Sequence, residues 1–220
     1  CSSDLNISKQ FGGRVILDDI SATMESGKCN LIIGTSGSGK TVLTKCMVGL
    51  FKPDTGGILY GGQDMFSMEN DTRKQLRQQI GMLFQGTALF DSMTVEQNVL
   101  FPLNMFTRWT LAEKKHRVDE VLDRVNLNDA HNRFPSEISG GMKKRVGIAR
   151  AIVSDPTLLL CDEPTGDLDR KSGDEVLDLL QALNEQQGKT IIMVTHDPRA
   201  AERARRVLHL EKGQLVRESV

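Results

Sequence analysis

The sequence predicts an α/β fold built on a parallel sheet that is covered on both faces. Two short apolar runs, 158–161 and 190–194, are typical of strands buried on both sides, and a helical pattern separates them. A strand, a glycine-rich loop and a helix follow one another over 31–50, which is half of a β–α–β unit. Parallel neighbours need such crossovers, so these observations favour a sheet with helices on both faces.

The first half of the chain predicts strands of two kinds. Apolar and polar residues alternate over 5–24, with Gly12 and Gly13 after the first segment, and this pattern indicates short antiparallel strands. After them we expect a strand at 31–33, a helix at 41–50 that stops before Pro53, a glycine-rich hairpin at 56–62, a polar helix at 72–79 and a core strand at 82–84.

The second half opens with helices. Thr110 and Glu113 form a capping box ahead of apolar positions at helical spacing, so an amphipathic helix begins there. Ser139 can cap another helix, which Asp155 and Pro156 end. We then expect a buried strand at 158–161, a helix at 175–183 that ends near Gly188, a buried strand at 190–194 and a hairpin of 207–210 with 215–216.

Composition excludes several classes of function. The 28 Lys and Arg balance 29 Asp and Glu, so the chain has no basic field for nucleic acid, and none is expected as a partner. The longest apolar runs are far shorter than the roughly 20 residues that span a bilayer, so membrane contact is expected only through another protein. Four cysteines without metal or disulfide spacing indicate a reducing compartment, with Cys161 as a small buried hydrophobe. The start at Cys1, without Met or a signal region, indicates a trimmed N-terminus.

A phosphate-binding loop is the clearest functional motif. Its glycines let the backbone curl so that successive N–H groups face phosphate oxygens, and the following helix adds partial positive charge. Lys40 reaches the β- and γ-phosphates, and Thr41 can hold Mg²⁺. The motif GxxxxGK[ST] is formed by Gly34, Thr35, Ser36, Gly37, Ser38, Gly39, Lys40 and Thr41.

Two adjacent carboxylates end the buried strand 158–161. Paired charges at a strand tip are costly unless something cationic or protic meets them. Beside a phosphate loop, Asp162 is expected to hold magnesium and Glu163 to polarise the attacking water as general base.

A second anion-binding turn is formed by Ser139, Gly140 and Gly141 at a helix start. One nucleotide needs only one phosphate loop, so the second turn suggests a composite site in which it faces a partner subunit's γ-phosphate. A plain helix cap is the alternative interpretation of these residues.

Six motifs in this order resemble the ABC-type ATPases over nearly the whole chain. They are the phosphate loop at 34–41, Gln85 after a strand, ISGGM at 138–142, LLLCDEP at 158–164, the acidic loop 166–169 and His196 after the strand 190–194. The resemblance implies ATP and Mg²⁺ as cofactors and a P-loop NTPase fold, with a RecA-like core, an antiparallel β-subdomain and a helical insertion. It implies one ABC ATPase domain over 1–220, in which 1–88 and 155–220 are the core and β-subdomain and 89–154 is the helical subdomain.

The resemblance also assigns roles to single residues. Gln85 would contact magnesium and water, and His196 would touch the γ-phosphate. Asp169 would belong to the nucleotide site, and Phe11 would stack on adenine, although a phenylalanine in a strand pattern also fits the core. Met142 stands where the family usually has Gln, so a polar role there is absent or is met by backbone.

The implied assembly is a head-to-tail homodimer that closes over two ATP molecules and binds integral-membrane permease subunits at the cytoplasmic face of the inner membrane. The segment 82–103 is similar to Mla or Mce-type phospholipid transport ATPases, whereas 163–173 is more similar to lipoprotein-release and macrolide-export ATPases of the LolD and MacB kind. A lipid transporter is the preferred expectation. Three alternatives stay open: a lipoprotein-release or macrolide-export ATPase, a regulatory scaffold resembling the FtsE division protein, and a join of two genes.

Overall fold

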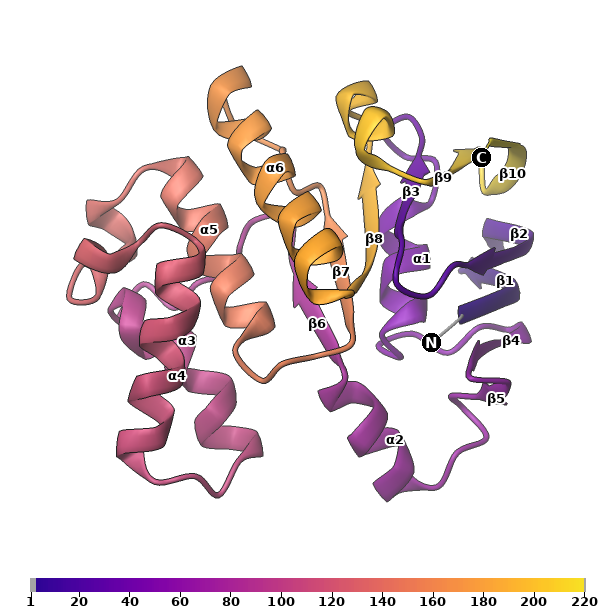
Figure 1. The fold of residues 1–220 in the computed structure, drawn as a ribbon. Helices are drawn as coiled ribbons and strands as arrows, with labels where there is room; N and C mark the ends of the chain where they lie inside the picture. The colour runs from indigo at the N-terminus through magenta and orange to yellow at the C-terminus, as the bar shows by residue number, and fades with distance from the viewer. Residues whose placement is uncertain (1–2, 220) are drawn as a thin grey trace.

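A computed structural model describes residues 3–219, which contain two β-sheets and six α-helices (Figure 1). The four-stranded antiparallel sheet has the order β2-β1-β4-β5. The larger sheet has the order β10-β9-β3-β8-β7-β6 and is parallel except where β10 joins β9. The strands are β1 (Ser3–Phe11), β2 (Arg14–Met24), β3 (Cys29–Ile33), β4 (Thr55–Tyr60), β5 (Gln63–Asp64), β6 (Ile80–Leu83), β7 (Leu158–Asp162), β8 (Thr190–Thr195), β9 (Arg206–Glu211) and β10 (Gln214–Ser219).

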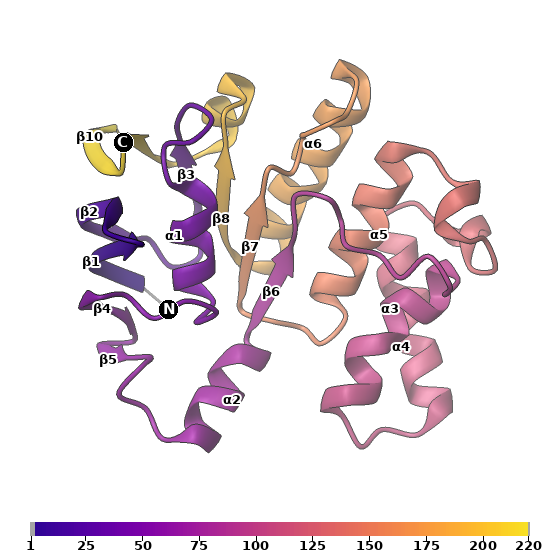
Figure 2. The same ribbon diagram turned by 180° about the vertical axis from the view of Figure 1, so that it is seen from behind.

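The helices divide between the two ends and faces of the larger sheet. Figure 2 shows α3, α4 and α5 gathered beyond β6, and the four-stranded sheet at the opposite end of the molecule. The helices are α1 (Lys40–Met47), α2 (Asn70–Gln78), α3 (Val95–Phe106), α4 (Leu111–Arg124), α5 (Gly140–Ile152) and α6 (Arg170–Gln187), with 3-10 turns at Asn128–Ala130, Pro135–Glu137 and Pro198–Arg203.

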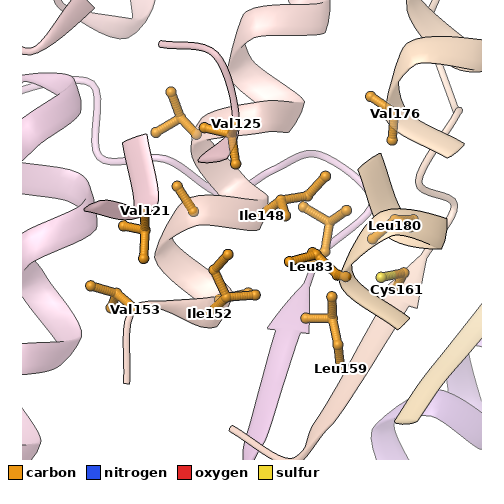
Figure 3. Close-up of a cluster of buried hydrophobic side chains, with 14 of the residues drawn as sticks. Leu83, Val121, Val125, Ile148, Ile152, Val153, Leu159, Cys161, Val176 and Leu180 are labelled. Atoms are coloured by element: carbon orange, nitrogen blue, oxygen red, sulfur yellow. The ribbon is translucent and has the colours of Figure 1, made fainter. Parts of the chain in front are cut away.

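Alternating side chains of the central strands build two hydrophobic cores. Leu159 and Cys161 of β7 face helices α3 to α6 on one side of the sheet (Figure 3). Leu158 and Leu160 face α1 and the four-stranded sheet on the other. Because successive strand residues point to opposite faces, a strand between two covered faces is apolar throughout. The apolar runs 158–161 and 190–194 predicted this arrangement.

Several predicted boundaries are wrong. The helix expected at 175–183 begins at Arg170, because Asp169 accepts a hydrogen bond from the Ser172 amide and caps it there. The strand expected at 82–84 ends at Leu83, and Phe84 is exposed. Helix α3 was not predicted from the residue pattern, although it lies in the range 89–154 that the resemblance assigns to a helical subdomain. The alternating N-terminal segments form antiparallel strands as predicted, but these are two long strands, β1 and β2, paired in one hairpin.

Within residues 3–219, no helix combines the length and apolar character needed to cross a bilayer. Cys29, Cys46 and Cys161 are buried free thiols, and burial raises the pKa of Cys161 far above its ordinary value. The interpretation of Cys161 as a small buried hydrophobe is therefore confirmed. Cys1 lies outside the described residues.

Candidate functional site

The phosphate loop connects β3 to α1 and is packed too tightly for larger residues at two glycines. A Cβ at Gly34 would lie 2.3 Å from the Leu210 carbonyl oxygen. Gly39 has a φ of 103°, a left-handed conformation that favours glycine, and its Cβ would lie 2.9 Å from the Ile16 carbonyl oxygen. The loop therefore keeps its curled path because strands β9 and β2 close in on it from outside.

Lys40 folds back over this loop. Its Nζ donates hydrogen bonds to the carbonyl oxygens of Gly34, at 2.8 Å, and Thr35, at 3.0 Å. The same ammonium lies 3.6 Å from Oε1 of Glu163, and both side chains are largely buried. The first residue of α1 thus brings a cation to the end of β7.

Glu163 is held at one carboxylate oxygen. Its Oε2 accepts hydrogen bonds from the Thr195 hydroxyl at 2.8 Å and from the His196 ring at 3.0 Å. Burial acts to raise the pKa of Glu163, but these hydrogen bonds, with the charges of His196 and Lys40, outweigh it and lower that pKa. Glu163 is therefore ionised at neutral pH.

Asp162 has the opposite electrostatics. Burial and the neighbouring charge of Glu163 raise its pKa, and its Oδ1 atom is buried without a hydrogen-bond partner. A buried carboxylate oxygen in this state is stabilised by a cation. Ser38 has a buried hydroxyl without a partner in the same loop region. These two unpaired atoms fit a site that takes a metal ion and phosphate oxygens.

About half of the predicted site residues line two clefts that share Gln85 and Glu163. A cleft of about 270 Å³ is lined by five residues of the loop and by Gln85 and Glu163, and it shares the last two with a second cleft of about 410 Å³ that reaches His196. Among the described residues there is no cluster of three or more metal-ligating His, Cys, Asp or Glu side chains. Magnesium can instead be held by one carboxylate, a hydroxyl and substrate phosphate oxygens. The first cleft is lined by Ile16, Ser36, Gly37, Gly39, Lys40, Thr41, Val42, Gln85 and Glu163.

The Ser139 turn lies elsewhere. The Ser139 hydroxyl accepts from the Met142 amide and caps α5, while Gly140 and Gly141 face Leu168 and Ser172. None of the three glycine-turn residues lines either cleft of the phosphate loop.

Asp169 and Phe11, which were predicted to belong to the nucleotide site, also line neither cleft. Asp169 accepts from the amide and the hydroxyl of Ser172 and serves as the cap of α6. Phe11 is 43% exposed and its ring meets Phe51 edge-on with 5.3 Å between centroids, so the alternative that places it in the core is wrong.

Sequence reasoning missed two residues that contact Glu163. Thr195 binds its carboxylate, and Lys144 of α5 donates to its carbonyl oxygen at 2.9 Å. A signal existed for Lys144, because it stands three residues from Gly141 and from Gly147 on the buried face of α5. A cation on an apolar helix face needs a specific partner.

Solved structures with this fold cover nearly the whole chain. A dimeric ATP-binding cassette described in a post-hydrolysis state bound to ADP and Pi has a TM-score of 0.90 and 32% identity, covering 100% of this chain and 98% of that chain. The cbiO1 protein of Clostridium perfringens, described as part of an ABC transporter complex, has a TM-score of 0.90 and 28% identity, covering 99% of this chain and 87% of its own. The predicted ABC ATPase fold is confirmed.

Curated relatives carry the name of a methionine import ATP-binding protein, MetN. The protein of Corynebacterium efficiens is 42% identical over 92% of this chain and 56% of its own length, and that of Caulobacter vibrioides is 38% identical over 97% and 65%. The chain thus spans less than two thirds of these relatives. Their names do not support the preferred lipid assignment. The ABC transporter family profile matches residues 17–166, and the chain belongs to that family as an ABC-type ATPase cassette.

Proposed function

We propose that this chain hydrolyses ATP and that the reaction drives a membrane permease. The observation that carries the proposal is the position of Glu163, an ionised and buried carboxylate fixed at one oxygen by Thr195 and His196. Its other oxygen lies 3.6 Å from Lys40 of the phosphate loop. A carboxylate held in this way can orient a water molecule beside a bound triphosphate.

The loop residues hold the nucleotide. Backbone amides of 34–41 and the ammonium of Lys40 neutralise the phosphate oxygens. To bind them, the Lys40 ammonium gives up its hydrogen bonds to the carbonyl oxygens of Gly34 and Thr35. Thr41, Gln85 and Asp162 would hold magnesium, whose positive charge would offset that of the phosphate groups. Phe11, exposed at the end of β1, offers its ring to adenine.

Glu163 polarises the attacking water. The water oxygen bonds to the γ-phosphorus while the bond to the ADP oxygen breaks, which gives ADP and inorganic phosphate. His196 keeps Glu163 in place and lies within reach of the phosphate product, since it lines the cleft beside Glu163.

The site is completed by a second copy of the chain. The start of α5, formed by Ser139, Gly140 and Gly141, lies away from the phosphate loop of its own chain. It faces Leu168 and Ser172, the segment that contains Asp169. We place the start of α5 and Asp169 against the γ-phosphate of a partner subunit in a head-to-tail dimer, an arrangement supported by the dimeric cassette with a similar fold.

An apolar groove provides the surface for the permease. It has a volume of about 560 Å³, and its lining includes Phe84, the residue before Gln85 of the nucleotide cleft. Exposed aromatic and thioether side chains on such a surface favour protein association over solvent. The chain therefore works as a peripheral subunit at the cytoplasmic face of the inner membrane. We define the aromatic groove as Phe84, Phe90, Phe101, Pro102, Met105 and Phe106.

The cargo is an amino acid or a lipid. Identity of 38–42% to proteins named for methionine import supports amino-acid import. The lipid assignment rests only on the likeness of the segment after Gln85 to phospholipid transport ATPases. Reconstitution with the permease encoded beside this chain separates the two, by ATP-dependent uptake of labelled methionine or by transfer of labelled phospholipid.

Isolation from the native membrane tests the permease partnership. The chain is expected to retain a polytopic membrane protein and to release phosphate from ATP with magnesium. Phe106→Asp should lose the membrane protein, while Leu50→Asp, at a residue that is at least as exposed but lies outside the groove, should keep it. Recovery of a cell-division protein without a permease favours the scaffold, and absence of phosphate release contradicts the proposed chemistry.

A further inference from the structure

Lys144 is a buried cation to which the chemistry above gives no part. It lies in α5 with 4% of its surface exposed. Its Nζ donates hydrogen bonds to the carbonyl oxygen of Gln85 at 2.6 Å and to that of Glu163 at 2.9 Å. One ammonium thus joins the backbone of two residues that reach the nucleotide cleft from different strands.

The backbone of Glu163 needs such a partner. Its φ of 51° lies in the left-handed region, which is unfavourable for a residue with a side chain. The Glu163 amide donates to the Val194 carbonyl at 2.7 Å, while its own carbonyl accepts from Lys144 and from the Gly166 amide. These bonds fix the direction in which the carboxylate leaves the chain.

The loop after Gln85 is held by the same helix. Thr87 and Ala88 both have positive φ values, and Arg150 of α5 donates to their carbonyl oxygens at 2.6 and 2.7 Å. Between the two cations lies Gly147, where a Cβ would be 2.7 Å from Leu83 Cδ1. Helix α5 therefore packs directly against the end of β6. Lys144 binds the start of the loop 85–88 at Gln85, and Arg150 binds its end.

We propose that Lys144 is a positioning residue for ATP hydrolysis, which holds Glu163 and Gln85 at a fixed separation across the cleft. The inference rests on the proposed roles of those two residues. Loss of either hydrogen bond lets the strained backbone relax and moves the carboxylate, and small displacements of this kind are costly to catalysis. Because both hydrogen bonds of the Lys144 ammonium go to backbone carbonyl oxygens, and Lys144 lines neither nucleotide cleft, ATP binding is expected to be independent of it.

A matched pair of variants tests the proposal. Gln and Met have side chains of equal length, but only Gln can donate two hydrogen bonds. Lys144→Met is expected to lower kcat by between ten- and a hundredfold with an unchanged Kd for ATP, and Lys144→Gln to restore most of the native rate. The readouts are phosphate release, binding of a fluorescent ATP analogue and thermal unfolding.

Lys189→Met is the control for loss of a buried lysine. Lys189 is also largely buried and donates to Asp155 and to the Pro156 carbonyl, at the opposite end of β8. It is expected to lower the melting temperature with native kcat.

Four results overturn the inference. They are equal kcat for the Met and Gln variants of Lys144, a matching loss in Lys189→Met, a loss confined to ATP affinity, and a folded Lys144→Gln chain with less than a tenth of native kcat. The last applies even if Lys144→Met fails to fold. If Glu163→Gln is active, the proposed function is refuted. If Glu163→Gln is inactive but Lys144→Met is fully active, only the role of Lys144 is refuted.

Discussion

The Nδ1 atom of His196 lies 3.0 Å from Oε2 of Glu163, so the residue after β8 supports the carboxylate at the end of β7. A carboxylate can only accept, and the hydrogen bond therefore requires a proton on Nδ1. This contact also helps to lower the pKa of Glu163 against the opposing effect of burial. The imidazole thereby affects both the orientation and the charge of the proposed base.

His196→Ala is expected to reduce kcat by about tenfold to a hundredfold, because the carboxylate loses a hydrogen bond that orients it. The pKa of Glu163 should rise, so the acidic limb of the kcat–pH profile should move to higher pH. His116→Ala, on the exposed face of α4, is the control and should leave both unchanged. A profile identical to that of the native chain would contradict the role of His196.

Glu163→Gln should keep ATP binding, stop turnover and accumulate a closed dimer. Gln retains the size of the side chain but cannot act as a base, for which a loss of roughly a hundredfold to ten-thousandfold is typical. Size-exclusion chromatography with ATP and magnesium checks the dimer, and phosphate release checks the chemistry. Turnover at the native rate would refute the assignment.

Lys40→Ala should weaken ATP binding by about tenfold to a hundredfold, which corresponds to the loss of hydrogen bonds made by a charged group. Lys45→Ala is the matched control, because Lys45 stands on the same helix with its Nζ 5.4 Å from the Phe51 ring. Isothermal titration with an ATP analogue gives both constants. An unchanged Kd for Lys40→Ala would exclude the phosphate-loop role.

The sequence predicted those strands and helices that are determined by residues within the element itself. The apolar runs 158–161 and 190–194 became β7 and β8, and the Thr110 capping box became the start of α4. Helix α3 was missed because it contains Pro102, and because the exposed apolar residues Met105 and Phe106 obscure its buried stripe of Val95, Val99 and Leu103. A local signal was nevertheless present, since Thr94 and Gln97 form a capping box at its start.

Only those site residues that belong to a continuous sequence motif could be predicted from the residues themselves. The phosphate loop and Asp162-Glu163 carry their chemistry in adjacent residues. The partners of Glu163 come from β8 and α5, and no local pattern specifies that these elements meet at the end of β7. The order β9-β3-β8-β7 likewise follows from packing on both faces of the sheet rather than from any single segment.

Ser139→Ala should impair hydrolysis through the partner subunit, by about tenfold if its turn binds the γ-phosphate. Mixing it with Lys40→Ala tests the shared site. In a mixed dimer, the intact Lys40 of one subunit meets the intact Ser139 of the other, so activity should reappear. A mixture without any recovered phosphate release would argue against composite sites.

Asp155 provides a pH-dependent contribution to stability away from the catalytic cleft. The hydrogen bond from Lys189, at 2.8 Å, lowers the pKa of Asp155 below its ordinary value near 3.8 and outweighs the effect of burial. The contribution is therefore fully present above that ordinary value and is lost as the pH falls through the lowered pKa.

Asp155→Asn should destabilise the chain at pH 7 by about 1 kcal/mol, because the buried Lys189 loses its anionic partner while the Asp155 side chain is itself mostly exposed. Chemical unfolding measures the difference, which should shrink towards zero on acidification below pH 3.8. Asp71→Asn removes a carboxylate from an exposed pair in the first turn of α2 and should cost only about a few tenths of a kcal/mol. A difference that stays constant into acid would mean that the stabilisation comes from the shape of the loop at Asp155 rather than from its charge.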